Sequence, residues 1–204
     1  VHGDLNGANI LIDARHNVWI IDFFHTSRSH VLKDLAKLEN DLLFIFTPIQ
    51  DEAELGEALR ITRALRAVND FRAPLPESLE GVHSAHIVRA WDTVRILRKW
   101  VAKLARSDRH PLQMSVARLR YAAHTLSFDE SSKLQRTWAL AAACGFAEDI
   151  QTAASRSTQL RVDWLSPSVL SGPGCLGLTI CPGRTDRGRN LDQDLSTLRE
   201  MGAN

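Results

Sequence analysis

The sequence predicts a mainly α-helical protein that opens with a small β-hairpin and closes with a short β/α segment. Three observations favour this fold class. Two runs rich in β-branched residues flank a polar insert near the start of the chain. Apolar residues then recur at helical spacing through much of residues 31–154. A stretch rich in serine, proline and glycine follows, ahead of one more strand-like run and one more helix-like run.

Composition sets the broad class of the protein. Of the 204 residues, 44% are hydrophobic and 24% are charged, which is typical of a soluble globular protein. The formal net charge of +1 gives no field that would indicate a nucleic-acid or membrane-surface partner. No apolar run approaches the roughly 20 residues of a membrane span. The three cysteines favour reduced thiols, and hence a cytoplasmic location, over a disulfide framework.

The predicted hairpin comes first in the chain. Its strands are residues 10–12 and 18–21, and the polar residues 13–17 form the turn between them. Asn9 directly precedes the first strand, and Asp22 directly follows the second. Because antiparallel strands joined by a short turn bring their outer ends together, we expect Asn9 and Asp22 to be neighbours.

The first two predicted helices cover residues 31–46 and 51–68. An apolar stripe indicates the buried face of the first helix, and Pro48 ends it. The second opens with acidic residues, which suit a helix N-terminus. The residues expected to face inward are Val31, Leu35, Leu38, Leu42 and Ile45 in the first helix, and Leu55, Leu59 and Leu65 in the second.

Further helices are predicted over residues 83–106, 112–126 and 130–154. The first of them has a markedly basic face, which we interpret as solvated, with an anionic partner as the alternative. The last is rich in alanine, and Asp129 is its expected N-cap. Over residues 83–106 the expected buried residues are Ile87, Trp91, Val94, Leu97, Val101 and Leu104, and the basic residues are Arg89, Arg95, Arg98, Lys99, Lys103 and Arg106.

The opening stretch points most clearly to chemistry. Phosphoryl transfer requires a carboxylate that orients or deprotonates the attacking hydroxyl, and oxygen ligands for the Mg²⁺ that bridges the nucleotide phosphates. Asp4 and Asn9 have the spacing D-x4-N, which lets a short loop hold the carboxylate toward an acceptor and the amide oxygen toward a metal. Asp22 would supply a second, charged metal ligand. The alternative is that Asp4 and Asn9 are ordinary turn residues.

The same stretch resembles the catalytic loop of the kinase-like fold. His2-Gly3-Asp4-Leu5-x3-Asn9-Ile10-Leu11 and Ile21-Asp22-Phe23 are similar to the aminoglycoside phosphotransferase and choline kinase branch. Protein kinases usually carry Arg in place of Gly3, Lys in place of Asn6 and Gly in place of Phe24. The continuation, residues 25–39, resembles the kinase-like ternary-complex-associated domains of bacterial signalling and conflict proteins.

This resemblance implies the C-terminal lobe of a phosphotransferase that uses ATP and Mg²⁺ to phosphorylate a hydroxyl acceptor. It implies that Asp4 is the catalytic base and that Asn9 and Asp22 bind Mg²⁺ and nucleotide. It also implies that His2 and Asp34 are buried polar groups that brace the loop. Asp34 as a solvated charge is the alternative. His25 and His30 are interpreted as ordinary loop residues, with substrate contact as the alternative.

The N-terminal lobe of such an enzyme carries a phosphate-binding loop and a strand lysine, and neither is found in this sequence. The chain begins with Val1 and the motif starts at residue 2, so we expect a piece of a longer protein. We therefore predict that the chain alone transfers no phosphate. The acceptor stays open, as a small molecule or a protein. The alternative functions are a catalytically inactive pseudokinase and a scaffolding module.

After a kinase-like lobe at residues 1–154, a linker is predicted at 155–174 and the start of a phosphatase-like domain at 175–204. Residues 175–181 are a possible strand, and residues 191–201 a short amphipathic helix. The pattern Gly177-Leu178-Thr179-x2-Pro182-Gly183-Arg184, with residues 190–203, resembles the opening of kinase-associated, dual-specificity-type phosphatases. The nucleophile of that family would lie beyond residue 204.

A second phosphatase pattern overlaps this segment. Cys181 and Arg187 have the spacing C-x5-R of a cysteine phosphatase loop, in which the thiolate attacks phosphate and the arginine holds its oxygens. The flanking residues differ from that loop, and Pro182 removes one of its backbone donors. We therefore interpret this match as a coincidence, and a phosphatase acting through Cys181 stays the third hypothesis.

Overall fold

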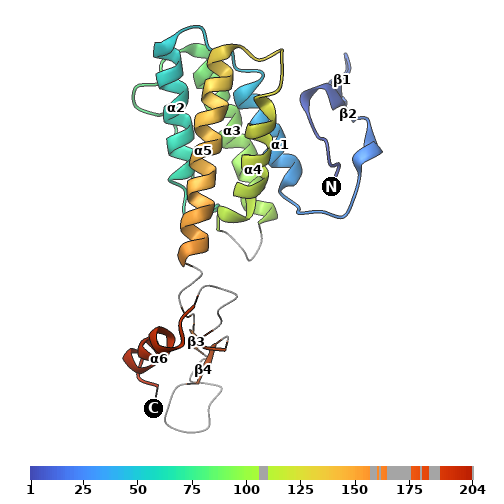
Figure 1. Cartoon of the computed structure of the whole chain (residues 1–204). Coiled ribbons are helices and arrows are strands. Elements are labelled where there is room, and N and C mark those ends of the chain that lie inside the picture. Colours follow the sequence, from blue (N-terminus) through green and yellow to red (C-terminus); the bar gives the residue numbers. More distant parts are fainter. Residues whose placement is uncertain are drawn as a thin grey trace. The chain divides into compact units, whose positions relative to one another are not determined.

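The computed structural model describes residues 1–105, 110–156, 160, 162–164, 176–179, 181–183 and 189–203. The chain divides into two units, Val1–Ile150 and Gln151–Asn204. The described residues are mostly helical, with two small antiparallel hairpins, which confirms the predicted fold class. Figure 1 shows the elements in chain order.

The first unit opens with the predicted hairpin. The short 3₁₀ helix η1 (Gly7–Asn9) leads into β1 (Ile10–Ile12), which pairs antiparallel with β2 (Val18–Ile20), so that Ile10 faces Ile20. The turn is built on Asp13, whose carboxylate accepts hydrogen bonds from the backbone amides of Arg15 and Asn17, both at 2.9 Å. A second 3₁₀ helix, η2 (Phe23–His25), follows.

The helical body contains α1 (Lys33–Phe44), α2 (Glu52–Arg66), α3 (Ala85–Leu104), α4 (Leu112–Thr125) and α5 (Lys133–Arg156). These are the helices that the sequence predicts, with ends shifted by up to three residues. Asp51 caps α2 by accepting a hydrogen bond from the amide of Glu54 at 2.9 Å. The predicted N-cap of α5 is wrong. Ser132 caps this helix instead of Asp129, through reciprocal hydrogen bonds with Gln135 at 3.2 and 2.9 Å.

Two apolar clusters hold the helical body together. The larger joins α2, α3 and α5 around Trp91 and Trp138, whose indole N–H groups donate to the carbonyl of Pro76 (3.2 Å) and the hydroxyl of Thr62 (2.8 Å). The smaller joins α1, α3 and α4 around fully buried Leu32 and Met114. Each buried indole is therefore packed in the core and also has a hydrogen-bond acceptor for its N–H group.

The prediction of which face of the first helix is buried is wrong. The buried face is rotated about the helix axis relative to the predicted one. Val31 is 45% exposed, and Leu35, Leu38, Leu42 and Ile45 are only partly buried. The face that packs inward instead carries Ala36 and Leu43 together with charged and amide side chains. Those buried polar residues are Lys37, Glu39, Asn40 and Asp41.

Ion pairs explain why charged residues occupy that buried face. Glu39 lies 2.7 Å from the Nε atom of Arg98 and 3.1 Å from that of Arg118. Burial lowers the pKa of Arg118 to about 10. Lys37 contacts both carboxylate oxygens of Asp41 at 2.7 Å. Buried charged groups are stable only when they are paired. On α1, these ion pairs therefore occupy buried positions where apolar side chains were expected.

Two expectations for the third helix also need correction. Arg98 is only 6% exposed, so it belongs to the buried ion cluster and not to a solvated basic face. Leu104, expected to be buried, is 38% exposed near the helix end. The other expected core residues of this helix are buried or half-buried. Arg106 lies outside the described residues.

The second unit contains β3 (Val162–Trp164), β4 (Gly177–Thr179) and α6 (Leu191–Glu200). The two strands pair antiparallel, with Val162 opposite Thr179. β3 lies within the stretch predicted as a linker, and β4 within the predicted strand. The predicted helix is present, capped by the side chain of Asn190. The proposed domain boundaries themselves stay a prediction.

A buried ion pair fixes the start of α6. Asp194 accepts from Arg189 Nη2 at 2.7 Å and from the amide of Gly183 at 2.8 Å, and these bonds hold the pKa of Asp194 below its usual value.

Cys181 is a free, exposed thiol. Arg184, Arg187, Cys175 and Ile180 lie outside the described residues. Within the described part of the chain, no helix combines the length and the apolar character needed to cross a membrane.

Candidate functional site

The loop from Asp4 to Asn9 is folded back on itself by its asparagines. The side-chain oxygen of Asn6 accepts from the amides of Ala8 (2.9 Å) and Asn9 (3.2 Å), and its Nδ2 donates to the Asp4 carboxylate at 3.2 Å. Asn9 donates from Nδ2 to the backbone carbonyl of Asp4 at 2.9 Å. The loop thus fixes the Asp4 carboxylate from one side. Asn6, noted in the sequence only as a departure from protein kinases, is the residue that caps η1.

The hairpin brings the second part of the motif beside the first. The amide of Ile21 donates to the carbonyl of Asn9 at 3.0 Å, one step beyond the β1–β2 ladder. Asp22 follows directly in the chain, so its backbone adjoins the residue that pairs with Asn9. Its backbone is left-handed (φ 61°), which is uncommon for a residue other than glycine. Its side chain is exposed and makes no capping hydrogen bond.

Asp34 attaches this loop to the helical body. It lies in the first turn of α1, half-buried, and its two carboxylate oxygens accept from the amides of His2 (2.6 Å) and Gly3 (2.9 Å). His2 is buried, and its Nε2 donates to the carbonyl of Ile21 at 2.8 Å. Both residues therefore make bonds of the kind expected for residues that brace the loop.

Gly3 has no room for a side chain. Its φ is +93°, a conformation that favours glycine, and a Cβ there would overlap the carbonyl oxygen of His25. The tight approach of residues 2–4 to η2 therefore depends on this glycine. It also gives a physical reason why Gly stands where protein kinases carry Arg.

The side-chain oxygens of Asn9 and Asp22 are ligands of the type that Mg²⁺ prefers. Because Asn9 uses its amide nitrogen on the loop, its amide oxygen accepts no hydrogen bond within the described part of the chain, and the Asp22 carboxylate is exposed. Among the described residues, no group of three or more His, Cys, Asp or Glu is placed to hold a metal by itself. Mg²⁺ commonly takes one or two protein oxygens and completes its shell with phosphate oxygens and water. The two residues fit Mg²⁺ in that mode.

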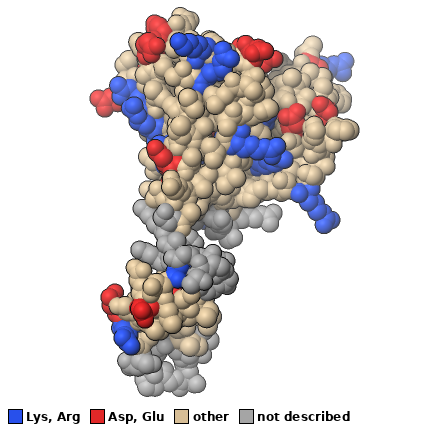
Figure 2. Space-filling view, in the orientation of Figure 1, with Lys and Arg blue, Asp and Glu red and all other residues tan. Residues whose placement is uncertain are grey.

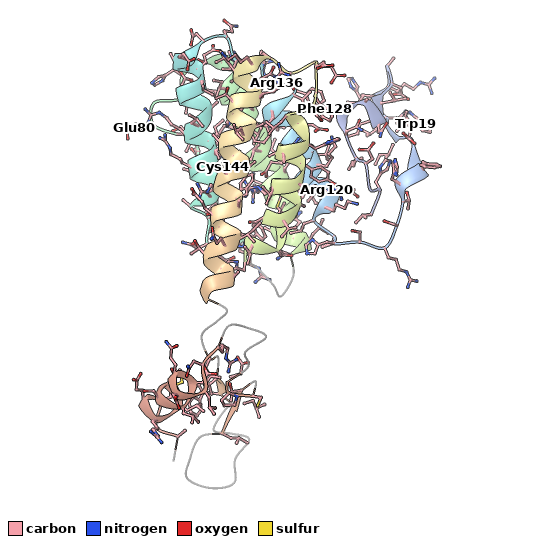
Figure 3. The ribbon with its side chains drawn as sticks, in the orientation of Figure 1. Trp19, Glu80, Arg120, Phe128, Arg136 and Cys144 are labelled. Carbon is pink, nitrogen blue, oxygen red and sulfur yellow. The ribbon has the colours of Figure 1, made fainter. Side chains whose placement is uncertain are left out.

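A pocket of about 750 Å³ opens beside Asp4. Gly3, Asp4 and Asn6 form one wall, and side chains from α1 and α4 form the other. Figure 3 shows Arg120 and Phe128 on the side of the helices that faces the N-terminal segment. The residues that line the pocket are Gly3, Asp4, Asn6, His25, Lys33, Lys37, Arg120, Tyr121, His124 and Phe128.

The family follows from a comparison of the sequence with protein-family models. Residues 1–127 match the model described as Ternary complex associated domain 9. The chain belongs to this family. The matched part of this ternary complex associated domain runs from the loop at Asp4 through α4, and so includes the motif residues and nearly all of the pocket. Comparisons with curated proteins and with solved structures found no match.

Sequence reasoning missed the helical wall of the pocket. Lys33, Arg120, Tyr121 and His124 carry no motif, and their spacing along the chain gives no sign that they meet Asp4. His25 lines the pocket, which favours the alternative that it contacts a substrate. His30 caps the turn before α1, where its Nδ1 accepts from the amide of Leu32 at 3.3 Å.

Proposed function

We propose that this domain is the acceptor-binding and metal-binding lobe of an ATP-dependent phosphotransferase in bacterial signalling. The single observation that carries the proposal is a loop in which Asn9 bonds to the Asp4 carbonyl and pairs with Ile21, the neighbour of Asp22, while Asp4 lines a pocket. Phosphoryl transfer is largely a matter of positioning and charge stabilisation, which such a small set of residues can serve. The remainder of the nucleotide site would come from a separate N-terminal lobe.

In this proposal each residue has a defined task. Asp4 orients the acceptor hydroxyl and takes its proton as the hydroxyl oxygen bonds to the γ-phosphorus. The bond from that phosphorus to the β–γ bridging oxygen breaks, ADP leaves with the electron pair, and the proton passes from Asp4 to solvent. Mg²⁺, when bound, neutralises charge on the nucleotide phosphates. Asn9 and Asp22 hold that metal, and His2 and Asp34 keep the loop in place.

Two substitutions separate nucleotide binding from transfer. In the complete natural protein that contains this chain, Asp22→Ala should weaken Mg·ATP binding at least tenfold, because a charged metal ligand is lost. Asp4→Asn should leave that affinity within about twofold but lower phosphate transfer by a factor of 10² or more. Calorimetry with Mg·ATP and radiolabelled ATP turnover measure the two effects. Asp92→Asn, an exposed carboxylate on α3, is the matched control.

The outcomes discriminate among hypotheses. Unchanged Mg·ATP affinity in Asp22→Ala contradicts the proposed metal site. Mg·ATP binding without any turnover in the unmodified protein indicates a pseudokinase. Turnover by residues 1–204 alone contradicts the proposal that a separate lobe is required.

A scaffolding module is the second candidate, and a specific feature favours it. The hairpin exposes Leu11, Ile12, Val18 and Trp19, each between 49% and 67%. Leu11 and Trp19 are cross-strand neighbours on one face of the hairpin, and Ile12 and Val18 are neighbours on the other. Each face therefore carries an exposed apolar pair, and exposed apolar groups that lie together are typical of interaction surfaces. The family description, a ternary complex associated domain, also fits a protein that assembles with others. Absence of Mg·ATP binding in the complete protein would favour this candidate.

We also propose that the second unit is the start of a phosphatase-like domain in a cytoplasmic protein. Support comes from the strand at Gly177–Thr179 and from the helix capped at Asn190. It also comes from the resemblance of this segment to the opening of dual-specificity-type phosphatases. The free thiols of Cys144 and Cys181 fit a reducing compartment. Phosphatase activity that survives Cys181→Ser would exclude Cys181 as the nucleophile.

A further inference from the structure

The wall opposite Asp4 differs in charge from the loop that carries Asp4. Lys33 and Lys37 extend from α1, and Arg120 and His124 from α4, into the lining of the same pocket. Asp4 is the one carboxylate among the described residues that line it. Basic and acidic side chains are mixed on the face seen in Figure 2, and the formal net charge of the chain is +1, so this local excess of cations is not part of a general basic field.

Two of these cations have no carboxylate partner. Lys37 is neutralised by Asp41 at 2.7 Å. Asp34, close by, already accepts from the amides of His2 and Gly3. Among the residues that the structure describes, neither Lys33 nor Arg120 forms an ion pair with an acidic side chain. A half-exposed pocket whose lining carries two cations outside any ion pair of the described residues can accommodate an anionic group.

We propose that the acceptor is a small hydroxyl compound that carries a phosphate or carboxylate group. Its anionic end lies against Arg120 and Lys33, and its hydroxyl points to Asp4. This inference rests on the proposed phosphotransferase function and specifies its substrate class. The volume, about 750 Å³, is that of a small-molecule site, for which roughly 300–1,000 Å³ is usual.

The side chains around Arg120 are suited to holding such a group. A guanidinium presents a planar fork of donors that matches a phosphate or carboxylate in a bidentate manner. The Arg120 guanidinium lies 6.0 Å from the ring centre of Tyr121 and Lys37 lies 5.8 Å from it, so both cations are within cation–π distance of this aromatic ring. Burial raises the pKa of Tyr121, and its phenol, protonated at neutral pH as in any ordinary tyrosine, can donate a hydrogen bond.

The same charges argue against two other ligands. An acceptor with several ammonium groups would face Lys33 and Arg120 with a single lining carboxylate to balance it. The nucleotide is assigned elsewhere, because Asn9 and Asp22, the proposed metal ligands, are not among the described residues that line this pocket. The pocket therefore lies on the acceptor side of Asp4.

Binding can be tested without nucleotide. In the complete natural protein, NMR titrations would compare ribose 5-phosphate with ribose and gluconate with glucose, and would include glucosamine as a cation. We expect the anionic member of at least one pair to bind tenfold or more tightly than its neutral parent. The two pairs show whether phosphate or carboxylate is preferred.

Variants locate the effect. Arg120→Gln and Lys33→Gln should each remove most of the anion preference, about tenfold, because a charge-assisted contact is lost. Arg89→Gln, an exposed arginine on α3 away from the pocket, should keep it. Mg·ATP affinity should stay within about twofold in all three variants.

Several results would overturn the proposal. They are equal binding of charged and neutral compounds, preference for glucosamine, an anion preference that survives Arg120→Gln, and binding of acidic proteins only. Loss of Mg·ATP affinity in Arg120→Gln would also overturn it, because the cation would then serve the nucleotide. Failure of the phosphotransferase proposal shows separately, as missing Mg·ATP binding or turnover with anion binding intact.

Discussion

The N-terminal segment, residues 1–31, and the helical body of the same unit are stabilised in opposite ways. In the body, Trp91 and Trp138 are at most 2% exposed. In the segment, Trp19 is 58% exposed and Phe24 is 88% exposed. The body is held by apolar burial, whereas the segment is held by hydrogen bonds through Asp13, Asn6 and Asp34. The proposed catalytic residues therefore lie on the part of the unit with the least apolar burial of its own.

The largest test of this comparison substitutes one tryptophan in each region. Trp138→Ala should destabilise the unit by about 3–5 kcal/mol, because it leaves a cavity in the main cluster. Trp19→Ala should cost about 1 kcal/mol or less, since the indole is mostly in solvent already. Denaturant unfolding of both variants measures the difference. Similar losses in the two variants would contradict the contrast between the regions.

Asp34→Ala gives an intermediate effect because it cuts the link between the regions. Two charge-assisted hydrogen bonds to the amides of His2 and Gly3 would be lost, at a cost of about 1–3 kcal/mol in a half-buried setting. Amide hydrogen exchange at residues 2–4 should accelerate while exchange in α3 and α5 stays slow. Asp92→Ala is the control. Uniformly faster exchange would show that Asp34 supports the body and not the loop.

The smallest effect is local and depends on pH. Hydrogen bonds from Asn17 lower the pKa of Asp13 from 3.8 to about 2. A depressed pKa means that the stabilisation is complete above about pH 4 and is lost as the pH falls toward 2. The indole signal of Trp19, which donates to Asp13 at 3.2 Å, should report this transition by NMR. Asp13→Asn should abolish it, and an Asp13 midpoint near 3.8 would contradict the assigned hydrogen bonds.

The hairpin and the helices could be predicted from sequence because each depends on local pattern. The predicted strands and the short turn also placed Asn9 before the first strand and Asp22 after the second. The buried face of α1 could not be predicted, because Glu39 and Asp41 are buried by pairing with Arg98 and Lys37, and such pairing leaves no apolar periodicity. The N-cap of α5 was predictable in principle, since Ser132 and Gln135 have the spacing of a capping box.

The helical wall of the pocket required tertiary structure. Lys33 and Arg120 are far apart in sequence and meet only because α1 and α4 pack side by side. Neither residue belongs to a motif, and each alone resembles an ordinary surface cation. The proposed base and metal residues lie within one short stretch, so they were accessible to sequence reasoning, whereas the proposed acceptor-binding residues were not.

Lys33 and Asp34 are consecutive residues in the first turn of α1, and this adjacency has a thermodynamic consequence. One faces the proposed anion, and the other holds the backbone of the loop that bears Asp4. A ligand that restrains this turn through Lys33 also restrains the loop through Asp34, and an ordered loop favours the ligand to the same degree. In the proposed function, the acceptor and the loop that bears Asp4 are thus linked reciprocally, so that the acceptor would help to order the loop proposed to act on it.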